Sequence, residues 1–239
     1  MKKFFMAVIA LMMTLSASAQ FYIYCSDGNV IKVDSISMIA PSENVDSHNG
    51  HEYVDLGLSV KWATCNVGAT KPEEYGDYFA WGETQPKSNY DWSTYKWCNG
   101  SEYSLTKYCT NSSYGTVDNK TTLELSDDAA RANWGGSWRM PTREEQDELR
   151  QQCTWTWTTQ NGVNGYKVTG TNGKSIFLPA AGDRYDRLHG DAGIIGYYWS
   201  SSLNTGSPRS AWSVDFYSGY VGRYSYERSY GFSVRPVCQ

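Results

Sequence analysis

Apolar and polar residues alternate along the C-terminal stretch from Gly196 to Cys238. Its clearest run sets Trp212, Val214 and Phe216 against Ser213, Asp215 and Tyr217. A period of two residues sends the first set to one face of a strand and the second set to the other. The pattern predicts a strand with one face on an apolar core. Its other face, rich in Tyr, Ser and Gly, is expected to meet solvent.

Turn-forming residues divide the rest of the chain into short strands. Residues 20–40 hold two apolar runs around Asp27-Gly28, which predicts a small β-hairpin element. Residues 41–50 are polar and rich in turn formers, which indicates a linker to a main domain over residues 51–239. Asn161-Gly162 and Asn172-Gly173 predict two further hairpins.

Two short helices are predicted between the strands. Thr142-x-x-Glu145 is a capping box and predicts a helix that continues through Arg150. Ser126, followed by two aspartates suited to a first helical turn, predicts a shorter helix that ends at Gly135. Strand and turn formers outnumber helix formers, so we expect an α+β fold with antiparallel sheets and long loops.

Residues 1–19 have the features of a secretory signal peptide. Lys2 and Lys3 precede the apolar residues 4–15, and a small-residue cleavage site follows at residues 17–19. We therefore expect an exported protein that is secreted, periplasmic or held at the cell surface. The net charge is −4 and no basic run occurs, which argues against a nucleic-acid partner. No other segment is apolar enough to predict a membrane span.

Six cysteines follow the predicted signal peptide, and export permits disulfides between them. No C-x-x-C pair occurs, so zinc-ribbon and thioredoxin-type sites are not predicted. One sequence does not fix the connectivity. The preferred pairings are Cys153 with Cys238 and Cys98 with Cys109, while Cys25 and Cys65 are left without an assigned partner.

The polar side of the C-terminal stretch has the composition of an antibody binding surface. Tyr supplies large contact area at a low cost in entropy, and Ser and Gly adapt to a ligand. We therefore predict a binding surface for a protein or glycan ligand, with no metal and no other cofactor. The predicted contact residues are Ser207, Arg209, Ser210, Asp215, Tyr217, Tyr220, Gly222, Tyr224, Ser225, Tyr226, Arg228, Ser229 and Tyr230.

Four ordered motifs carry a resemblance to a known family. They are Trp138–Thr142, Leu178–Gly182, Gly196–Ser201 and Gly231–Arg235. In this order they resemble the major paralogous domain first described from Fibrobacter succinogenes, which is abundant in secreted proteins of Bacteroides-like gut bacteria. The resemblance implies a C-type lectin-like domain over residues 51–239. Formylglycine-generating relatives use a cysteine pair near the C-terminal region, where this chain has only Cys238, so their activity is not carried over.

A narrower resemblance is to proteins diversified by retroelements. In those proteins a reverse transcriptase rewrites adenines in a C-terminal variable segment, so that asparagine codons become Tyr, Ser, Asp, Gly, Thr or His. Positions such as Tyr217, Tyr220 and Tyr224 suit that chemistry. Diversification is a hypothesis here, because undiversified binding proteins share this composition.

Two functions of other classes stay open. A glycan-directed enzyme would need a cleft with two opposed carboxylates, and no G-x-S-x-G elbow is present. A structural surface or fimbrial component would assemble through the N-terminal hairpin instead.

Three further sets of residues are candidate sites. Asp183, Asp186 and Asp191 lie in a Gly-bounded stretch that could hold Ca²⁺, but the neighbouring arginines favour a solvated loop. His48 and His51, with Asp46, suggest a loose zinc site, but it lacks the third fixed ligand that zinc usually needs. Trp92 and Trp97, in a polar loop, are candidates for stacking on a sugar.

Overall fold

The computed structural model describes residues 21–24, 30–33 and 46–239. The predicted signal peptide lies outside the described residues, as does Cys25. Strands β1 (Phe21–Tyr24) and β2 (Val30–Val33) pair antiparallel. The chain divides into two units, residues 1–44 and residues 45–239, and this strand pair belongs to the first.

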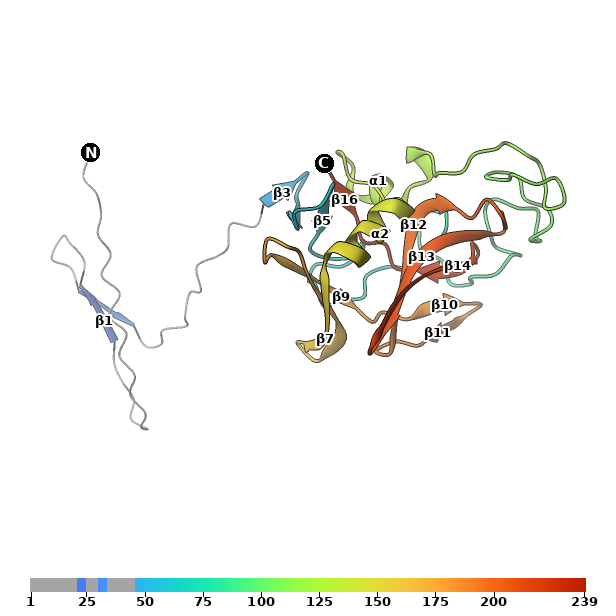
Figure 1. Cartoon of the computed structure of the whole chain (residues 1–239). Helices are drawn as coiled ribbons and strands as arrows, with labels where there is room; N and C mark the ends of the chain where they lie inside the picture. The colour runs from blue at the N-terminus through green and yellow to red at the C-terminus, as the bar shows by residue number, and fades with distance from the viewer. Residues whose placement is uncertain (1–20, 25–29, 34–45) are drawn as a thin grey trace. The chain divides into compact units, whose positions relative to one another are not determined.

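Four antiparallel sheets make up the second unit (Figure 1). The first contains β3 (Asp46–His48), β4 (His51–Val54), β5 (Lys61–Ala63) and β16 (Val237–Cys238). The second contains β7 (Thr154–Gln160), β8 (Val163–Thr169) and β9 (Ser175–Pro179). The third contains β11 (Leu188–Gly190), β10 (Asp183–Tyr185), β15 (Gly231–Phe232) and β6 (Phe79–Ala80). The fourth contains β12 (Ile195–Leu203), β13 (Ser210–Tyr217) and β14 (Tyr220–Glu227).

The two helices are short, and the fold is therefore α+β. Helix α2 (Arg143–Gln152) begins at the predicted capping box, in which the Thr142 hydroxyl accepts from the Glu145 amide and the Glu145 carboxylate accepts from the Thr142 amide. Helix α1 (Ala129–Trp134) is capped by Asp128 instead of the predicted Ser126. Ser126 lies within a preceding 3₁₀ turn, η1 (Leu125–Asp127). No helix among the described residues has the length and apolarity needed to cross a membrane.

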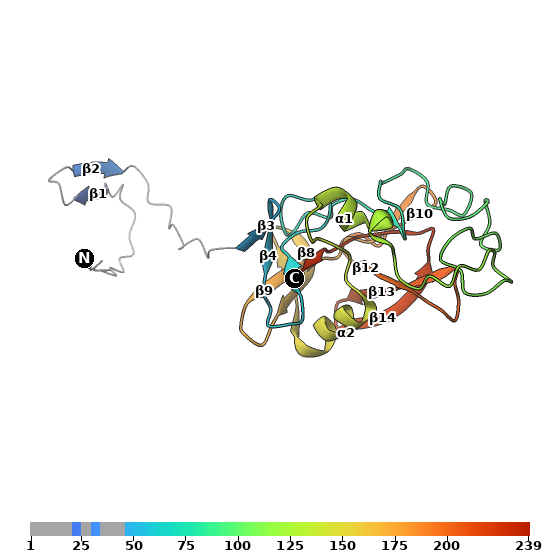
Figure 2. The same cartoon turned by 90° about the horizontal axis from the view of Figure 1, so that it is seen from above.

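Helix α2 covers one face of the β12–β14 sheet (Figure 2). Leu149 of the helix shares a core cluster with Val214 and Phe216 of β13. The Gln146 amide donates to the Tyr198 and Trp199 carbonyls of β12, at 3.0 and 3.1 Å. The predicted alternation along β13 therefore holds for Val214 and Phe216, which are buried in this cluster. Trp212 on the same side is only partly buried, beside Arg143 and Arg223, and Ser213, which was expected to face solvent, is fully buried.

The opposite face of the same sheet is covered only in part. Trp199, Leu203 and Ala211 belong to a second core cluster, which also contains Trp138 and Phe232. Toward the β13–β14 turn the side chains on this face are exposed, among them Tyr217 and Tyr224. This face of the sheet is thus buried around Trp199 and Leu203 and exposed near the β13–β14 turn.

The main unit begins earlier than the predicted boundary at residue 51. Residues 46–48 form β3, which pairs with β4 through a turn at Asn49-Gly50. Both turn residues have positive φ, +48° and +81°, as expected of an Asn-Gly hairpin turn. This turn signal lies within the polar stretch that indicated a linker.

The two preferred disulfides are not present. Among the described residues Cys65, Cys98, Cys109, Cys153 and Cys238 are all free. The Cys98 and Cys109 sulfurs each face a backbone carbonyl instead, of Trp92 and Asn111, at 3.1 Å in both cases. Cys238 is buried in the cluster around Trp138, whereas Cys153 packs against the cluster around Leu149. Cys153 and Cys238 therefore lie in different core clusters.

Candidate binding face

The register of the β12–β14 sheet places several tyrosines on one face. Tyr217 on β13 lies opposite Tyr220 on β14. Asp215 on β13 lies between Tyr197 on β12 and Gly222 on β14. Because alternate residues of a strand share a face, Tyr224 and Tyr226 are on this side as well.

The tyrosine rings form a continuous row. Tyr217 stacks on Tyr220 with ring centres 5.1 Å apart, and Tyr224 follows at 6.5 Å and Tyr226 at a further 6.4 Å. Tyr226 packs edge to face on Phe232, which contacts Tyr230. We call this surface the Tyr face, and its members are Tyr185, Tyr197, Tyr217, Tyr220, Tyr224, Tyr226 and Tyr230.

The turn at one end of the row is held in place by the scaffold. Tyr217 and Tyr220 are joined by two residues, of which Gly219 has φ of +86°, a conformation that favours glycine. The buried Tyr166 of β8 donates its hydroxyl to the Tyr217 carbonyl at 3.2 Å and accepts from the Gly219 amide at 3.1 Å. The turn therefore presents Tyr217 and Tyr220 from a fixed position.

Gly222 makes room for a neighbouring ring. A Cβ at this position would lie 2.5 Å from the Tyr220 hydroxyl and 2.7 Å from a carbon of its ring. The Tyr220 side chain thus lies across the glycine and donates to the Tyr224 hydroxyl at 3.1 Å. The glycine determines how the half-buried ring beside it lies.

Asp215 lies below the rings. Asp215 is only 6% exposed, and its Oδ2 accepts a hydrogen bond from the Tyr226 hydroxyl at 3.2 Å. Burial raises the pKa of this carboxyl above its ordinary value. Burial, followed by the nearby Asp215 charge, also raises the pKa of Tyr226, so that phenol stays protonated and donates at neutral pH.

Five of the predicted contact residues are buried, which corrects the expectation that they face outward. They are Ser210, Asp215, Gly222, Arg228 and Ser229. Arg228 is enclosed between the Trp81 and Tyr95 rings and donates to the Tyr108 carbonyl at 2.8 Å. It holds a loop to the core and does not reach a ligand.

Three other predicted residues lie away from the Tyr face. Ser225 is on the opposite side of β14, where its hydroxyl accepts from the Asn204 amide at 2.9 Å. Arg209 is in the β12–β13 connection and forms an ion pair with Glu102. Ser207 is in the same connection, where its amide donates to the Asn204 carbonyl at 3.0 Å. The remaining predicted residues, Tyr217, Tyr220, Tyr224, Tyr226 and Tyr230, do lie together.

The structure adds two tyrosines that the sequence did not indicate. Tyr185 contacts Tyr230 with ring centres 5.0 Å apart, and Tyr197 contacts Tyr226 at 5.5 Å. Tyr197 lies in the motif Gly196–Ser201, but its outward side becomes evident only from the strand register. Tyr185 is brought in by β10, which pairs with β15 through Arg184 and Gly231.

The stretch from Asp183 to Asp191 is a hairpin, which corrects the expected loop. Strands β10 and β11 pair around a turn at Asp186, whose φ is +51°. Within the described ranges no group of three or more His, Cys, Asp or Glu side chains is arranged to share a metal ion.

The two tryptophans considered for sugar stacking are engaged within the protein. The Trp97 ring has Lys96 and Lys107 nitrogens at 4.3 and 4.7 Å from its centre, and its indole donates to the Gly82 carbonyl. The Trp92 indole donates to the Glu227 carboxylate at 2.9 Å.

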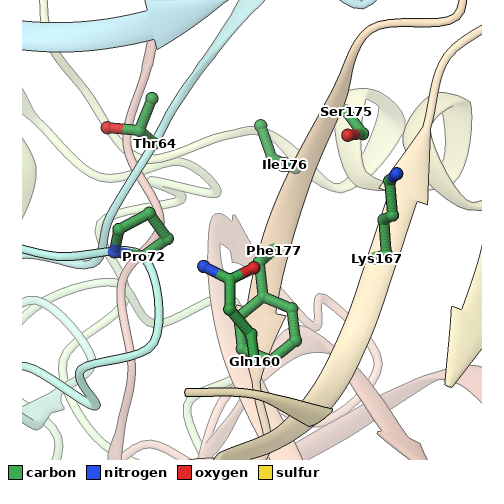
Figure 3. Close-up of a pocket in the computed structure, with 7 residues that line it drawn as sticks. All are labelled: Thr64, Pro72, Gln160, Lys167, Ser175, Ile176 and Phe177. Carbon is green, nitrogen blue, oxygen red and sulfur yellow. The ribbon is translucent and has the colours of Figure 1, made fainter. Parts of the chain in front are cut away.

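Two pockets bear on the enzyme alternative. Figure 3 shows a pocket of about 270 Å³ between residues of β7–β9 and the loop with Thr64 and Pro72. Its one charged lining residue is Lys167, so it offers no pair of carboxylates. A pocket of about 380 Å³ is lined by Asp77 and Asp186, together with Lys87, Arg184 and Arg187. If the protein were a glycan-directed enzyme, Asp77 and Asp186 of this second pocket would be the carboxylates to substitute.

Together these features define an α+β domain with an aromatic face on one antiparallel sheet. The family of Lcl C-terminal domains matches residues 54–238, and the chain belongs to that family. A comparison with curated proteins found no match, and neither did a comparison with solved structures.

Proposed function

We propose that this protein is an exported ligand-binding protein, of receptor or adhesin type, that contacts a protein or glycan with its Tyr face. The observation that carries the proposal is the continuous row of rings on a braced sheet, in which Tyr217 and Tyr224 are 45% and 47% exposed. Exposed aromatic clusters mark interaction surfaces, and Tyr is enriched among the residues that dominate binding energy.

The rigidity of the frame supports this proposal. Ordering a side chain at an interface costs about 0.5–1.5 kcal/mol, and a surface that is already ordered avoids much of that cost. Tyr220 is held by its stack on Tyr217 and its hydrogen bond to Tyr224. The Tyr224 hydroxyl accepts a hydrogen bond from Tyr220. The rings of the Tyr face thus offer apolar area to a ligand, with hydroxyl groups at their edges.

The finer relationships suggested by the sequence belong to the same proposal. We propose a C-type lectin-like topology and kinship with the Fibrobacter major paralogous domain. Diversification by a retroelement would have to spare buried positions such as Asp215 and Gly222 and act at exposed ones such as Tyr217 and Tyr224. The coding DNA tests this point, since diversification requires a near-copy of the segment beside a reverse-transcriptase gene.

A substitution series on ligand arrays tests the proposed function. The mature chain is applied to defined glycan and peptide arrays, and any ligand found is then measured with Tyr217→Ala/Tyr220→Ala/Tyr224→Ala. We expect binding to fall at least about tenfold, because the substitution removes the exposed rings, with little change in melting temperature. Tyr226 is left intact because its ring packs against the core.

Tyr103→Ala is the matched control. Tyr103 is 61% exposed but lies in the loop between β6 and α1, where it stacks on Tyr114. Equal loss in the control, or full binding by the triple variant, contradicts the proposed function.

A further inference from the structure

We propose that the Tyr face recognises a cationic side chain, a lysine ammonium or arginine guanidinium, on a basic segment of a partner protein. The inference deepens the proposed function, on which it rests, by naming the chemistry of the ligand. It starts from Asp215, the buried carboxylate beneath the rings.

Asp215 lacks a partner on one of its oxygens. Oδ2 accepts from the Tyr226 hydroxyl, but Oδ1 is buried and has no hydrogen-bond partner within the described part of the chain. Buried polar atoms in native proteins are rarely left unsatisfied, and each one that is calls for an explanation. A donor supplied by a ligand would complete the coordination of this carboxylate.

The strand register directs Asp215 into the row of rings. It lies between Tyr197 and Gly222 on the face that carries Tyr217 and Tyr220. The opposite side of β13 belongs to Val214 and Phe216, which are in the core. Gly222, the cross-strand neighbour of Asp215, has no side chain, and the Tyr220 ring lies across it, held by its stack on Tyr217 and its hydrogen bond to Tyr224. The proposal requires a ligand to displace this ring on its way to Oδ1.

The surrounding charges favour a cation over a neutral donor. Asp191 accepts from the Tyr197 hydroxyl at 3.1 Å, and Asp183 pairs with Gly190 on the adjoining β10–β11 hairpin. The faces of aromatic rings attract cations through their quadrupoles. The carboxylates and the ring faces therefore both contribute negative potential, which attracts a cation.

The arginines of this sheet and of its adjoining hairpin and loop are engaged elsewhere. Arg223 forms an ion pair with Asp147 of α2, and Arg209 forms one with Glu102. Arg184 lies over the Tyr78 ring and lines a separate pocket together with Arg187. None of these four neutralises Asp215 in the described part of the molecule.

The extent of the Tyr face favours a protein segment as the source of the cation. The rings run from Tyr217 to Tyr226, and Tyr230 and Tyr185 lie beyond the buried Phe232, so the face extends past the reach of one small amine at Asp215. An extended segment could place a basic side chain at Asp215 and cover the neighbouring rings. The favoured occupant is therefore a basic peptide of a partner protein.

An NMR titration of the mature chain tests the inference. The probes are short capped peptides of glycine and serine with one central arginine, lysine, citrulline or glutamate. We expect the arginine and lysine peptides to shift the ring signals of Tyr217, Tyr220 and Tyr224. The citrulline peptide, which has nearly the same shape without the charge, should bind at least about tenfold more weakly.

Asp215→Asn should reduce the affinity for the arginine peptide at least about tenfold. The exposed Asp46→Asn, on β3, changes the net charge equally and should leave the affinity unchanged. Equal binding of arginine and citrulline peptides to the native chain, equal loss in both variants, or no shift with any peptide overturns the inference. If ligands from the arrays still require the exposed rings, these outcomes leave the proposed function intact.

Discussion

The sequence pattern predicts the sheet face on which Asp215 lies but not the residues that surround its side chain. Alternation with Val214 and Phe216 indicates which face of β13 carries its side chain. It does not indicate that Tyr197 lies beside it or that the Tyr226 hydroxyl donates to it, because those residues come from two other strands. The same limit applies to Arg228, which follows β14 in sequence and is buried against Trp81, Tyr95 and Tyr108.

The raised pKa of Asp215 has a consequence for stability. Its carboxyl binds a proton more tightly in the folded chain than in the unfolded chain, where the ordinary value is 3.8. Between the two pKa values the folded state holds more protons, so this group makes the unfolding free energy fall as pH rises. Below the unfolded value both states are protonated and the penalty disappears.

We therefore expect Asp215→Asn to be more stable than the native chain at pH 7, since the variant places no charge in this site. The advantage should shrink as the pH falls toward about 3, as followed by urea unfolding at several pH values. Asp46→Asn controls for net charge. A variant that is less stable at pH 7 and recovers in acid would show that the carboxylate stabilises the fold.

At the scale of elements, local signals predicted the local structure well. The Asn161-Gly162 turn joins β7 and β8, and both residues have positive φ. The capping box begins α2 at the expected residue. The β10–β11 hairpin was missed because its turn at Asp186-Arg187 lacks glycine and each of its strands is only three residues long. Pairing with β15, a contact distant in sequence, provides what the local pattern lacks.

Helix α2 supports the Tyr face from the far side of its sheet, and its cap is a direct test of that support. Thr142→Ala removes the acceptor for the Glu145 amide and should lower the unfolding free energy by about 1 kcal/mol. Ligand binding should persist, because the helix does not contact the exposed rings. Chemical denaturation measures the first effect and array binding the second.

Thr142→Ser retains a hydroxyl at the cap and is the matched variant. It should lose only a small part of the stability that Thr142→Ala loses. Equal loss in the two variants would mean that packing of the threonine methyl group, rather than the cap, accounts for the effect.

At the scale of the whole molecule, the α+β class was predicted and is confirmed, and membership of the Lcl C-terminal domain family covers most of the chain. The extent of the Tyr face was not predictable from one sequence. Tyr185 joins it through sheet pairing, and five expected contact residues are buried instead of facing solvent. The two preferred disulfides failed for the same reason, since they depended on contacts between distant segments.

The central claim is that exposed tyrosines of the β12–β14 sheet contact the ligand. Tyrosine-selective chemical labelling of the mature chain, read by mass spectrometry with and without a ligand found on the arrays, tests it most directly. The account predicts that Tyr217 and Tyr224 lose labelling when the ligand is bound, while Tyr103 is labelled equally in both samples. Unchanged labelling of Tyr217 and Tyr224 under saturating ligand, or protection of Tyr103 alone, would contradict it.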